Sequence, residues 1–404
     1  MKTIDRFLKY IKIDTMSDPL SNTSPTTKKQ FDLAHVLMEE LKELGLNPIL
    51  DDYCYIYAFI PANTSKKCDK IGFVAHMDTA PDASGKGVSK KIITNYDGSD
   101  IKLNDRLTMT RKEFSCLSDV IGDDLVVTDG TTLLGADDKA GVAEIMGLLD
   151  YVTNNPSFKH GDIYICFTPD EEVGKGTDHF NNKHFKADYA YTIDGGDIDT
   201  INYETFNAAS ASITFIGKSI HPGTAKNKLV NASLLAIEFS SMLSPVMRPE
   251  HTEGYEGFNH LTSMEGHCEE AKLGYIIRNH DKELFDKQKE TFKSIAPYMN
   301  QKYGYECVKL RISDSYQNMK EILEDKMDII NIAAKAIQNQ GLNPKFEAIR
   351  GGTDGARLTF DGIPCPNLGT GGFNFHGPFE FLSINRMNKC VDILIEIVRL
   401  VIEK

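Results

Sequence analysis

The chain has 404 residues, of which 41% are apolar, and a formal net charge of −13 at pH 7. This length exceeds what one hydrophobic core usually serves, so we expect two domains. The negative charge disfavours nonspecific binding to nucleic acid, and no apolar run approaches the length of a membrane helix, so we expect neither kind of partner.

The eight cysteines are scattered along the chain, and no two of them form a C-x-x-C pair. The first six residues lack the continuous apolar core of a signal peptide. Scattered thiols without a secretory signal favour a reducing compartment over disulfides or a cysteine-bound zinc ion. We therefore expect a cytoplasmic protein.

Amphipathic helical patterns open the chain in residues 1–50, and Gly45 is the expected helix stop. Strand and helix patterns then alternate to about residue 206. Three of the strand-like runs are continuously apolar, at 71–75, 163–167 and 189–193. Continuous runs of this kind, flanked by helices, predict an α/β fold with a mixed, mostly parallel sheet.

The pattern changes at about residue 208. Strand-like segments and two helical stretches, near 230–243 and 280–299, predict a smaller inserted α+β domain. After residue 316 the α/β pattern returns, with helices near 323–339 and 386–403. We therefore expect a discontinuous catalytic domain formed by 1–207 and 317–404, with an inserted domain at 208–316.

Histidine and acidic residues follow the three apolar runs. His76 and Asp78 end the first run and point the same way in an extended strand, because they are two residues apart. Glu171 and Glu172 follow the second run, and Asp194 follows the third. Ligands of parallel sheets gather beyond the carboxyl ends of the strands. The pattern therefore predicts a metal site at that edge.

Several candidates also have simpler explanations. Asp137 or Asp138 precedes a helical pattern and fits an N-cap. The acidic run 170–172 is of a kind that is more often a solvated turn, and the sequence leaves open which of its acids binds metal. His376 lies in a Gly-rich aromatic loop, where a histidine is usually only solvated.

Five motifs occur in order along the chain. They are His76-Met77-Asp78-Thr79, Gly135-Ala136-Asp137-Asp138-Lys139-Ala140-Gly141, Pro169-Asp170-Glu171-Glu172-Val173-Gly174, Ile193-Asp194-Gly195-Gly196 and His376-Gly377. By these motifs the chain resembles the two-zinc aminopeptidase, aminoacylase and desuccinylase superfamily of metallopeptidases. Within it, the chain is similar over essentially its whole length to the peptidase T family of tripeptide aminopeptidases, with further support at 206–210, 221–226, 252–258 and 349–355.

The resemblance implies two Zn²⁺ ions per subunit. Asp137 would bridge them, His76 and Asp194 would complete the shell of one ion, and Glu172 and His376 that of the other. Zinc takes imidazole and carboxylate ligands and keeps a position open for water in catalytic sites. Co²⁺ or Mn²⁺ is an expected substitute, because such sites discriminate poorly between metals.

Roles for the remaining candidates also follow from the resemblance. Glu171 would be the general base, and Asp78 would support His76. The inserted domain would be a lid and dimerisation domain, with His221 reaching substrate in the partner's site; its simpler explanation is a turn histidine. Arg278 or Arg350 would bind a peptide carboxylate, unless each forms an ordinary ion pair.

The expected protein is thus a homodimeric cytoplasmic enzyme that removes the N-terminal residue from tripeptides with a free amino terminus. A related alternative is a dipeptidase or an N-acyl amino-acid deacylase with the same metal centre. An alternative of another class is a catalytically silent peptide- or metal-binding protein. Its expected mark, the loss of Glu171 or of a metal ligand, is absent from the sequence.

Overall fold

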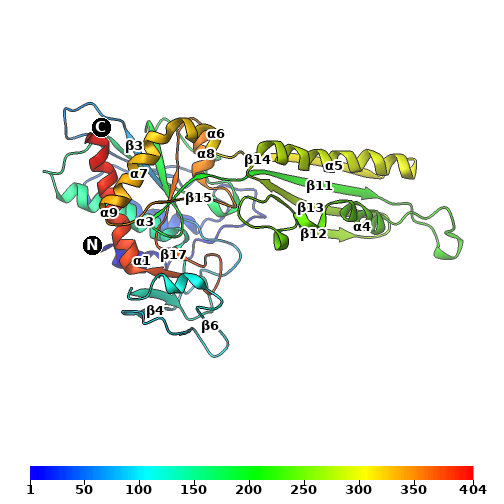
Figure 1. Ribbon diagram of the computed structural model, residues 1–404, viewed down its shortest axis with the longest axis horizontal. Coiled ribbons are helices and arrows are strands. Elements are labelled where there is room, and N and C mark those ends of the chain that lie inside the picture. The colour runs from blue at the N-terminus through cyan, green and yellow to red at the C-terminus, as the bar shows by residue number, and fades with distance from the viewer. Residues whose placement is uncertain (404) are drawn as a thin grey trace. The chain divides into compact units, whose positions relative to one another are not determined.

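The computed structural model describes residues 1–403 and divides the chain into two compact units (Figure 1). The first unit comprises 1–203, 321–347 and the residues from 353 onward, and the second comprises 204–320 and 348–352. The segment 348–352, which we expected in the first domain, groups with the second unit because backbone hydrogen bonds tie it there. The Ile349 amide donates to the Glu204 carbonyl at 2.9 Å, and the Phe206 amide donates to the Gly351 carbonyl at 3.2 Å.

An eight-stranded sheet forms the centre of the first unit, in the order β1-β2-β8-β3-β9-β16-β10-β15. The neighbours β8, β3, β9 and β16 are parallel, whereas β1, β2 and β10 pair in antiparallel fashion. This arrangement confirms the predicted fold class. The strands are β1 (Ile49–Leu50), β2 (Ile56–Ile60), β3 (Ile71–His76), β8 (Ile163–Thr168), β9 (Tyr189–Ile193), β10 (Thr200–Glu204), β15 (Lys345–Ala348) and β16 (Asn367–Leu368).

Helices cover both faces of this sheet. On one face Tyr191 of β9 donates a hydrogen bond to the Ile329 carbonyl in α7. Its neighbour Ala190 points the other way and packs with Leu358 of α8. Burial on both faces explains why β3, β8 and β9 are continuously apolar. The helices of the first unit are α1 (Thr3–Tyr10), α2 (Gln30–Glu43), α3 (Ala136–Asn154), α6 (Lys320–Leu323), α7 (Met327–Asn339), α8 (Asp354–Phe360) and α9 (Ile384–Glu403).

The stretch between the first two motifs departs from our prediction. We expected alternating strands and helices up to residue 206, but residues 80–130 form short strands and a single 3-10 turn. Short apolar runs such as 125–127 are separated here by Gly, Asp and Ser, which favour turns over helices. A small sheet results, in the order β17-β18-β7-β4, and β5 and β6 form a separate two-stranded sheet. The strands of the small sheet are β4 (Lys90–Ile93), β7 (Leu125–Thr128), β17 (Gly372–Phe373) and β18 (Phe381–Ser383), and those of the pair are β5 (Ile101–Lys102) and β6 (Thr108–Met109).

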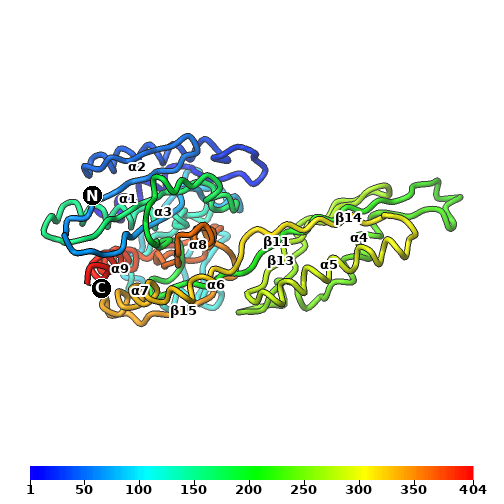
Figure 2. The backbone as a smooth tube through the Cα atoms, turned by 90° about the horizontal axis from the view of Figure 1, so that it is seen from above, coloured from blue at the N-terminus to red at the C-terminus, as the bar shows by residue number. Residues whose placement is uncertain are grey.

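The second unit is an antiparallel sheet with two helices on one face. Its order is β12-β13-β11-β14. Alternate residues of β11, such as Ile213 and Phe215, pack with Phe239 of α4 and Phe292 of α5, while Ser210 and Ser212 of the other face are exposed. Figure 2 shows both helices on the same side of the strands. The elements are β11 (Asn207–Ile216), α4 (Ala232–Met242), β12 (Phe258–Gly266), β13 (Glu270–Asn279), α5 (Lys282–Tyr303) and β14 (Val308–Tyr316).

Candidate metal centre

The register of the central strands brings the functional residues to one edge. His76, the last residue of β3, pairs with Thr168, the last residue of β8. Val74 of β3 pairs with Thr192 of β9, so β9 ends at the same level. The residues that follow these parallel strands therefore emerge side by side, as the sequence predicts.

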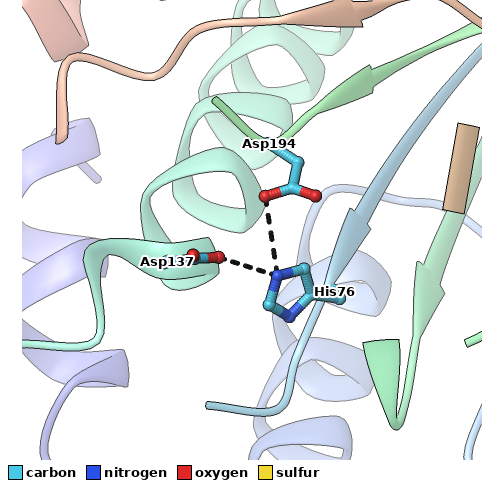
Figure 3. Close-up of side chains that lie close together, drawn as sticks. All are labelled: His76, Asp137 and Asp194. Atoms are coloured by element: carbon cyan, nitrogen blue, oxygen red, sulfur yellow. Dashed lines mark hydrogen bonds and ion pairs between the residues drawn. The ribbon is translucent and has the colours of Figure 1, made fainter. Parts of the chain in front are cut away.

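One cluster joins three of these side chains (Figure 3). His76 Nε2 lies 2.9 Å from Asp137 Oδ1 and 3.6 Å from Asp194 Oδ1. His76 comes from the end of β3, Asp137 from the start of α3, and Asp194 from the residue after β9. Their ligand atoms all lie close enough to surround one metal ion.

A second cluster shares Asp137 with the first. His376 Nε2 lies 3.3 Å from Asp137 Oδ2 and 3.0 Å from Glu172 Oε2. The two oxygens of Asp137 thus face different histidines, one in each cluster. These three ligand atoms also lie close enough to surround one ion. The arrangement is that of a carboxylate placed between two cation positions.

Asp78 connects the first histidine to the acidic loop. It is fully buried, and its Oδ1 lies 3.3 Å from His76 Nδ1. Its carboxylate also accepts the backbone amides of Glu171 and Glu172, at 3.0 and 3.2 Å. One side chain therefore orients both the His76 ring and the two adjacent acids.

The three consecutive acids separate into different environments. Asp170 is buried and points away from both clusters, because its carboxylate accepts the Thr26 amide, the Thr26 hydroxyl and the Gln30 side chain. Glu172 belongs to the second cluster, whereas Glu171 belongs to neither among the described residues. Glu171 is thus the acid of the run that lies beside the clusters without joining them.

The two aspartates at the start of α3 also have different roles. Asp138 accepts the Gly141 amide three residues later at 3.1 Å, as a capping aspartate does, and the His76 amide at 3.2 Å. Asp137 carries the side chain that enters both clusters. The simpler N-cap explanation therefore applies to Asp138.

The charges of the centre are strongly coupled. Asp137 and Glu172 raise the pKa of His376 to about 11, and burial together with Asp137 raises the pKa of Glu172 to about 8. Burial lowers the pKa of His76, but Asp194, Asp137 and Asp78 raise it by more, to well above its ordinary value. Burial and the charge of Asp194 raise the pKa of Glu171. The centre therefore attracts positive charge, whether protons or cations.

The donor set fits divalent metal ions. Each cluster offers one imidazole and two carboxylates, the ligand types that zinc prefers. In addition, Glu172 Oε1 is buried without a hydrogen-bond partner, which is costly unless a ligand contacts that oxygen. The residues present are therefore suited to hold metal in both clusters.

The three predicted substrate-binding residues lie in the second unit and have local contacts. His221 is exposed, and its Nδ1 accepts the Gly223 amide at 3.1 Å, as its turn explanation requires. Arg278 donates to the Ala209 and Ile277 carbonyls at 3.2 and 3.1 Å. Their part in substrate binding stays a prediction.

Arg350 is the most engaged of the three. It donates to the carbonyls of Gly254 and Glu256 at 2.6 and 2.8 Å and to the Thr252 hydroxyl at 2.9 Å, and it lies over the ring of Phe206. All of these acceptors are uncharged. Among the described residues, the hydrogen bonds of Arg278 and Arg350 go to uncharged acceptors, and the choice between a carboxylate site and an ordinary ion pair stays a prediction.

Sequence reasoning missed Glu380. This residue lies four positions after His376 and is 1% exposed, and its carboxylate accepts backbone amides of the loop that carries Asp137. The available signal was an acidic residue shortly after the motif His376-Gly377, directly before an apolar strand.

Comparisons with known proteins agree with this geometry. The profile of the peptidase family M20/M25/M40 matches residues 129–400. Peptidase T of Caldanaerobacter subterraneus subsp. tengcongensis is 52% identical over 402 residues, which cover 99% of this chain and 98% of that protein. Peptidase T of Clostridium perfringens is 51% identical over 404 residues, with full coverage of both chains.

Solved structures share the fold. The crystal structure of aminopeptidase PepT from Bacillus cereus has a TM-score of 0.78 at 21% identity and covers 100% of this chain and 98% of its own. A tripeptidase from Staphylococcus aureus has a TM-score of 0.79 at 23% identity with the same coverage.

Proposed function

Because the chain belongs to peptidase family M20/M25/M40, we propose that it is a metal-dependent aminopeptidase that releases the N-terminal residue of tripeptides. Relatives named Peptidase T, 52% and 51% identical over nearly the whole chain, support this substrate class. The structural observation that carries the proposal is Asp137, whose two oxygens face two separate ligand clusters.

His76, Asp137 and Asp194 would hold one metal ion, and Asp137, Glu172 and His376 the other. We assign Zn²⁺ to both positions, with Co²⁺ or Mn²⁺ as substitutes, from the imidazole and carboxylate donors. Bound there, the two ions would supply positive charge that polarises the scissile carbonyl and makes a water molecule more acidic.

Glu171 is the general base of this proposal. It lies beside both clusters, and Asp78 fixes its backbone amide. Its carboxylate takes the proton of the attacking water and gives it to the leaving amine. Burial and the charge of Asp194 raise the pKa of Glu171 above its ordinary value, which makes its carboxylate a better acceptor for the proton of water.

The two ends of a tripeptide require opposite charges. The acidic residues of the centre suit the free amino terminus of the substrate. Arg278 or Arg350, which bond only to uncharged acceptors, would supply the positive charge for the far carboxylate. Recognition of both ends by fixed groups would limit the length of the peptide.

We place a homodimer interface on the second unit, with His221 contributing to the partner's active site. The second unit offers an edge strand, β12, whose residues 262–266 are exposed. Its helix α4 also exposes Leu234 and Ile237, at 63% and 53%. Exposed apolar side chains beside an open sheet edge favour contact with a second copy.

The cytoplasm is the proposed location. All eight cysteines are free thiols, which suits a reducing compartment. Among residues 1–403, none of the helices combines the length and the apolar character that crossing a bilayer demands.

Substrate profiling tests the function. Purified enzyme loaded with Zn²⁺, Co²⁺ or Mn²⁺ should release the N-terminal residue of tripeptides faster than it cleaves dipeptides, tetrapeptides or N-acetyl amino acids. Preference for dipeptides or N-acetyl amino acids would favour the related alternatives. Metal binding without hydrolysis of any of these compounds would favour a silent binding protein.

A further inference from the structure

Glu380 is a buried carboxylate that neither ligand cluster uses. Its two oxygens accept three backbone amides from one short loop. Leu134 and Gly135 donate to Oε2 at 2.6 and 2.9 Å, and Asp137 donates to Oε1 at 3.1 Å. Backbone amides that converge in this way form a concave site for an anion, which here is a side chain of the same protein.

The other side of this contact is equally constrained. Glu380 ends a tight turn that begins at Gly377, because the Glu380 amide donates to the Gly377 carbonyl at 3.2 Å. His376 directly precedes this turn. The Thr128 hydroxyl donates to the Pro378 carbonyl at 3.1 Å, and the Asn374 side chain donates to the Phe379 carbonyl at 3.3 Å. The link between His376 and Glu380 is therefore short and held at several points.

We propose that Glu380 is a positioning residue that holds the loop 134–137 against the turn 376–380, and thereby sets the spacing between Asp137 and His376. This inference rests on the proposed metal centre. Asp137 and His376 are the two ligands of the second cluster that this contact joins. The third, Glu172, is placed by Asp78 instead.

The chemistry of the contact requires a carboxylate. A carboxylate has acceptors on both oxygens, so it can bind the amides of Leu134 and Gly135 on one side and that of Asp137 on the other. A glutamine has the same shape but only one acceptor oxygen. Its NH₂ group would then face a backbone N–H group, and one side of the contact would be lost.

The chain offers a matched control in Glu144. This glutamate lies in α3 of the same unit and is fully buried, and its carboxyl group accepts no backbone amide of residues 1–403 and lies beside the Cys390 thiol. Substitution of Glu144 by glutamine changes a buried carboxylate in the same way without touching either loop. Any effect common to both variants is then a general consequence of altering a buried acid.

The first measurement is hydrogen exchange without metal. In Glu380→Gln, either the amides of Leu134 and Gly135 or the amide of Asp137 should exchange about tenfold faster or more, because one side of the contact loses its buried acceptor. Glu144→Gln should leave them unchanged. Equal exchange in Glu380→Gln and wild type would overturn the proposal, and this outcome does not depend on the metal centre.

The second measurement is titration with Zn²⁺. Wild type should bind two equivalents, and Glu380→Gln should bind one with near-normal affinity and the other about tenfold more weakly or worse. Equal weakening of both equivalents, or the same loss in Glu144→Gln, would overturn the positioning role. Fewer than two equivalents in wild type would instead contradict the proposed function.

A milder variant keeps the test decisive if Glu380→Gln does not fold. Thr128→Val removes the hydroxyl that holds the Pro378 carbonyl but preserves the volume of the side chain. It should lower the affinity for the same Zn²⁺ equivalent that Glu380→Gln weakens, but only by a few-fold. Unchanged affinity for both equivalents in Thr128→Val would count against a turn that sets the ligand spacing.

Discussion

The edge of the large sheet and the second unit place their functional residues in different ways. At the sheet edge, His76 and Asp194 follow parallel strands in register and their side chains meet. In the second unit, His221, Arg278 and Arg350 each bond to nearby backbone atoms. Regular secondary structure thus brings the ligands of the first unit together. The three residues of the second unit have separate local contacts, so only a substrate or a partner subunit could bring them into one site.

The largest expected effect is a loss of turnover that distinguishes Glu171 from the adjacent Glu172 in the first unit. Glu171→Gln should lower turnover by roughly 10²–10⁴-fold and keep the metal content, because only proton transfer is lost. Glu172→Gln should instead lower the metal content, because Glu172 faces His376 in the second cluster. Metal analysis and turnover numbers for both variants check this. Near-normal turnover in Glu171→Gln would assign the base elsewhere.

Metal binding should be linked to protons in the first unit. The pKa of His376 is raised to about 11 by Asp137 and Glu172, and that of Glu172 to about 8 by burial and Asp137. Both values lie above 7, so this pair of side chains takes up protons at pH 7 that it must release to bind metal. Apparent affinity should therefore rise with pH, by up to about tenfold per released proton for each pH unit.

Calorimetry measures this linkage directly. The observed heat of Zn²⁺ binding at pH 7 should depend on the ionisation enthalpy of the buffer, because the buffer takes up the released protons. The same heat in buffers of very different ionisation enthalpy would show that the clusters bind metal without releasing protons.

Arginine variants of the second unit should change substrate affinity and not metal content. Arg278→Ala or Arg350→Ala, whichever removes the carboxylate contact, should raise the Michaelis constant for a tripeptide by about tenfold or more. The same variant should also narrow the difference in Michaelis constant between a tripeptide and its C-terminal amide. Arg248→Ala, an exposed arginine of the same unit, is the control. If the wild-type enzyme cleaves tripeptide and amide equally well, recognition of the carboxylate is ruled out.

The smallest expected effect concerns exchange between subunits. His221→Ala and Glu171→Gln should each be inactive, but a reassembled equal mixture should regain about a quarter of the wild-type activity. Random pairing makes half of the dimers mixed, and each mixed dimer then contains one intact site of two. Tagged subunits and size-exclusion chromatography verify the exchange. Proven exchange without recovery would contradict a shared active site.

The fold and the clusters differ in how far the sequence predicts them. Apolar runs predict β3, β8 and β9 because burial on both faces leaves a clear pattern, and the end of a strand is then a defined place for His76 or Asp194. Residues 80–130 were mispredicted because short strands and turns have no such pattern, and their pairing depends on β17 and β18 from the far end of the chain.

The acidic run shows where sequence reasoning stops. Asp170, Glu171 and Glu172 have the same chemistry, and their roles differ only through tertiary contacts. Asp170 meets Thr26 and Gln30, which are distant in the chain. Glu380 escaped notice for a related reason, since its partners are backbone amides, which every sequence contains. No pattern of side chains could reveal that three of them converge on one carboxylate.

The first unit is formed by chain segments on both sides of the second unit, and this sets the order in which the ribosome makes the ligands of the two clusters. His76, Asp137 and Asp194 are all made before the second unit begins, whereas His376 is made after the whole of that unit. At about 5–20 residues per second, the roughly 180 residues between Asp194 and His376 take on the order of 10–40 s. For that interval the growing chain carries one full set of three ligands, and it acquires the other only shortly before synthesis ends.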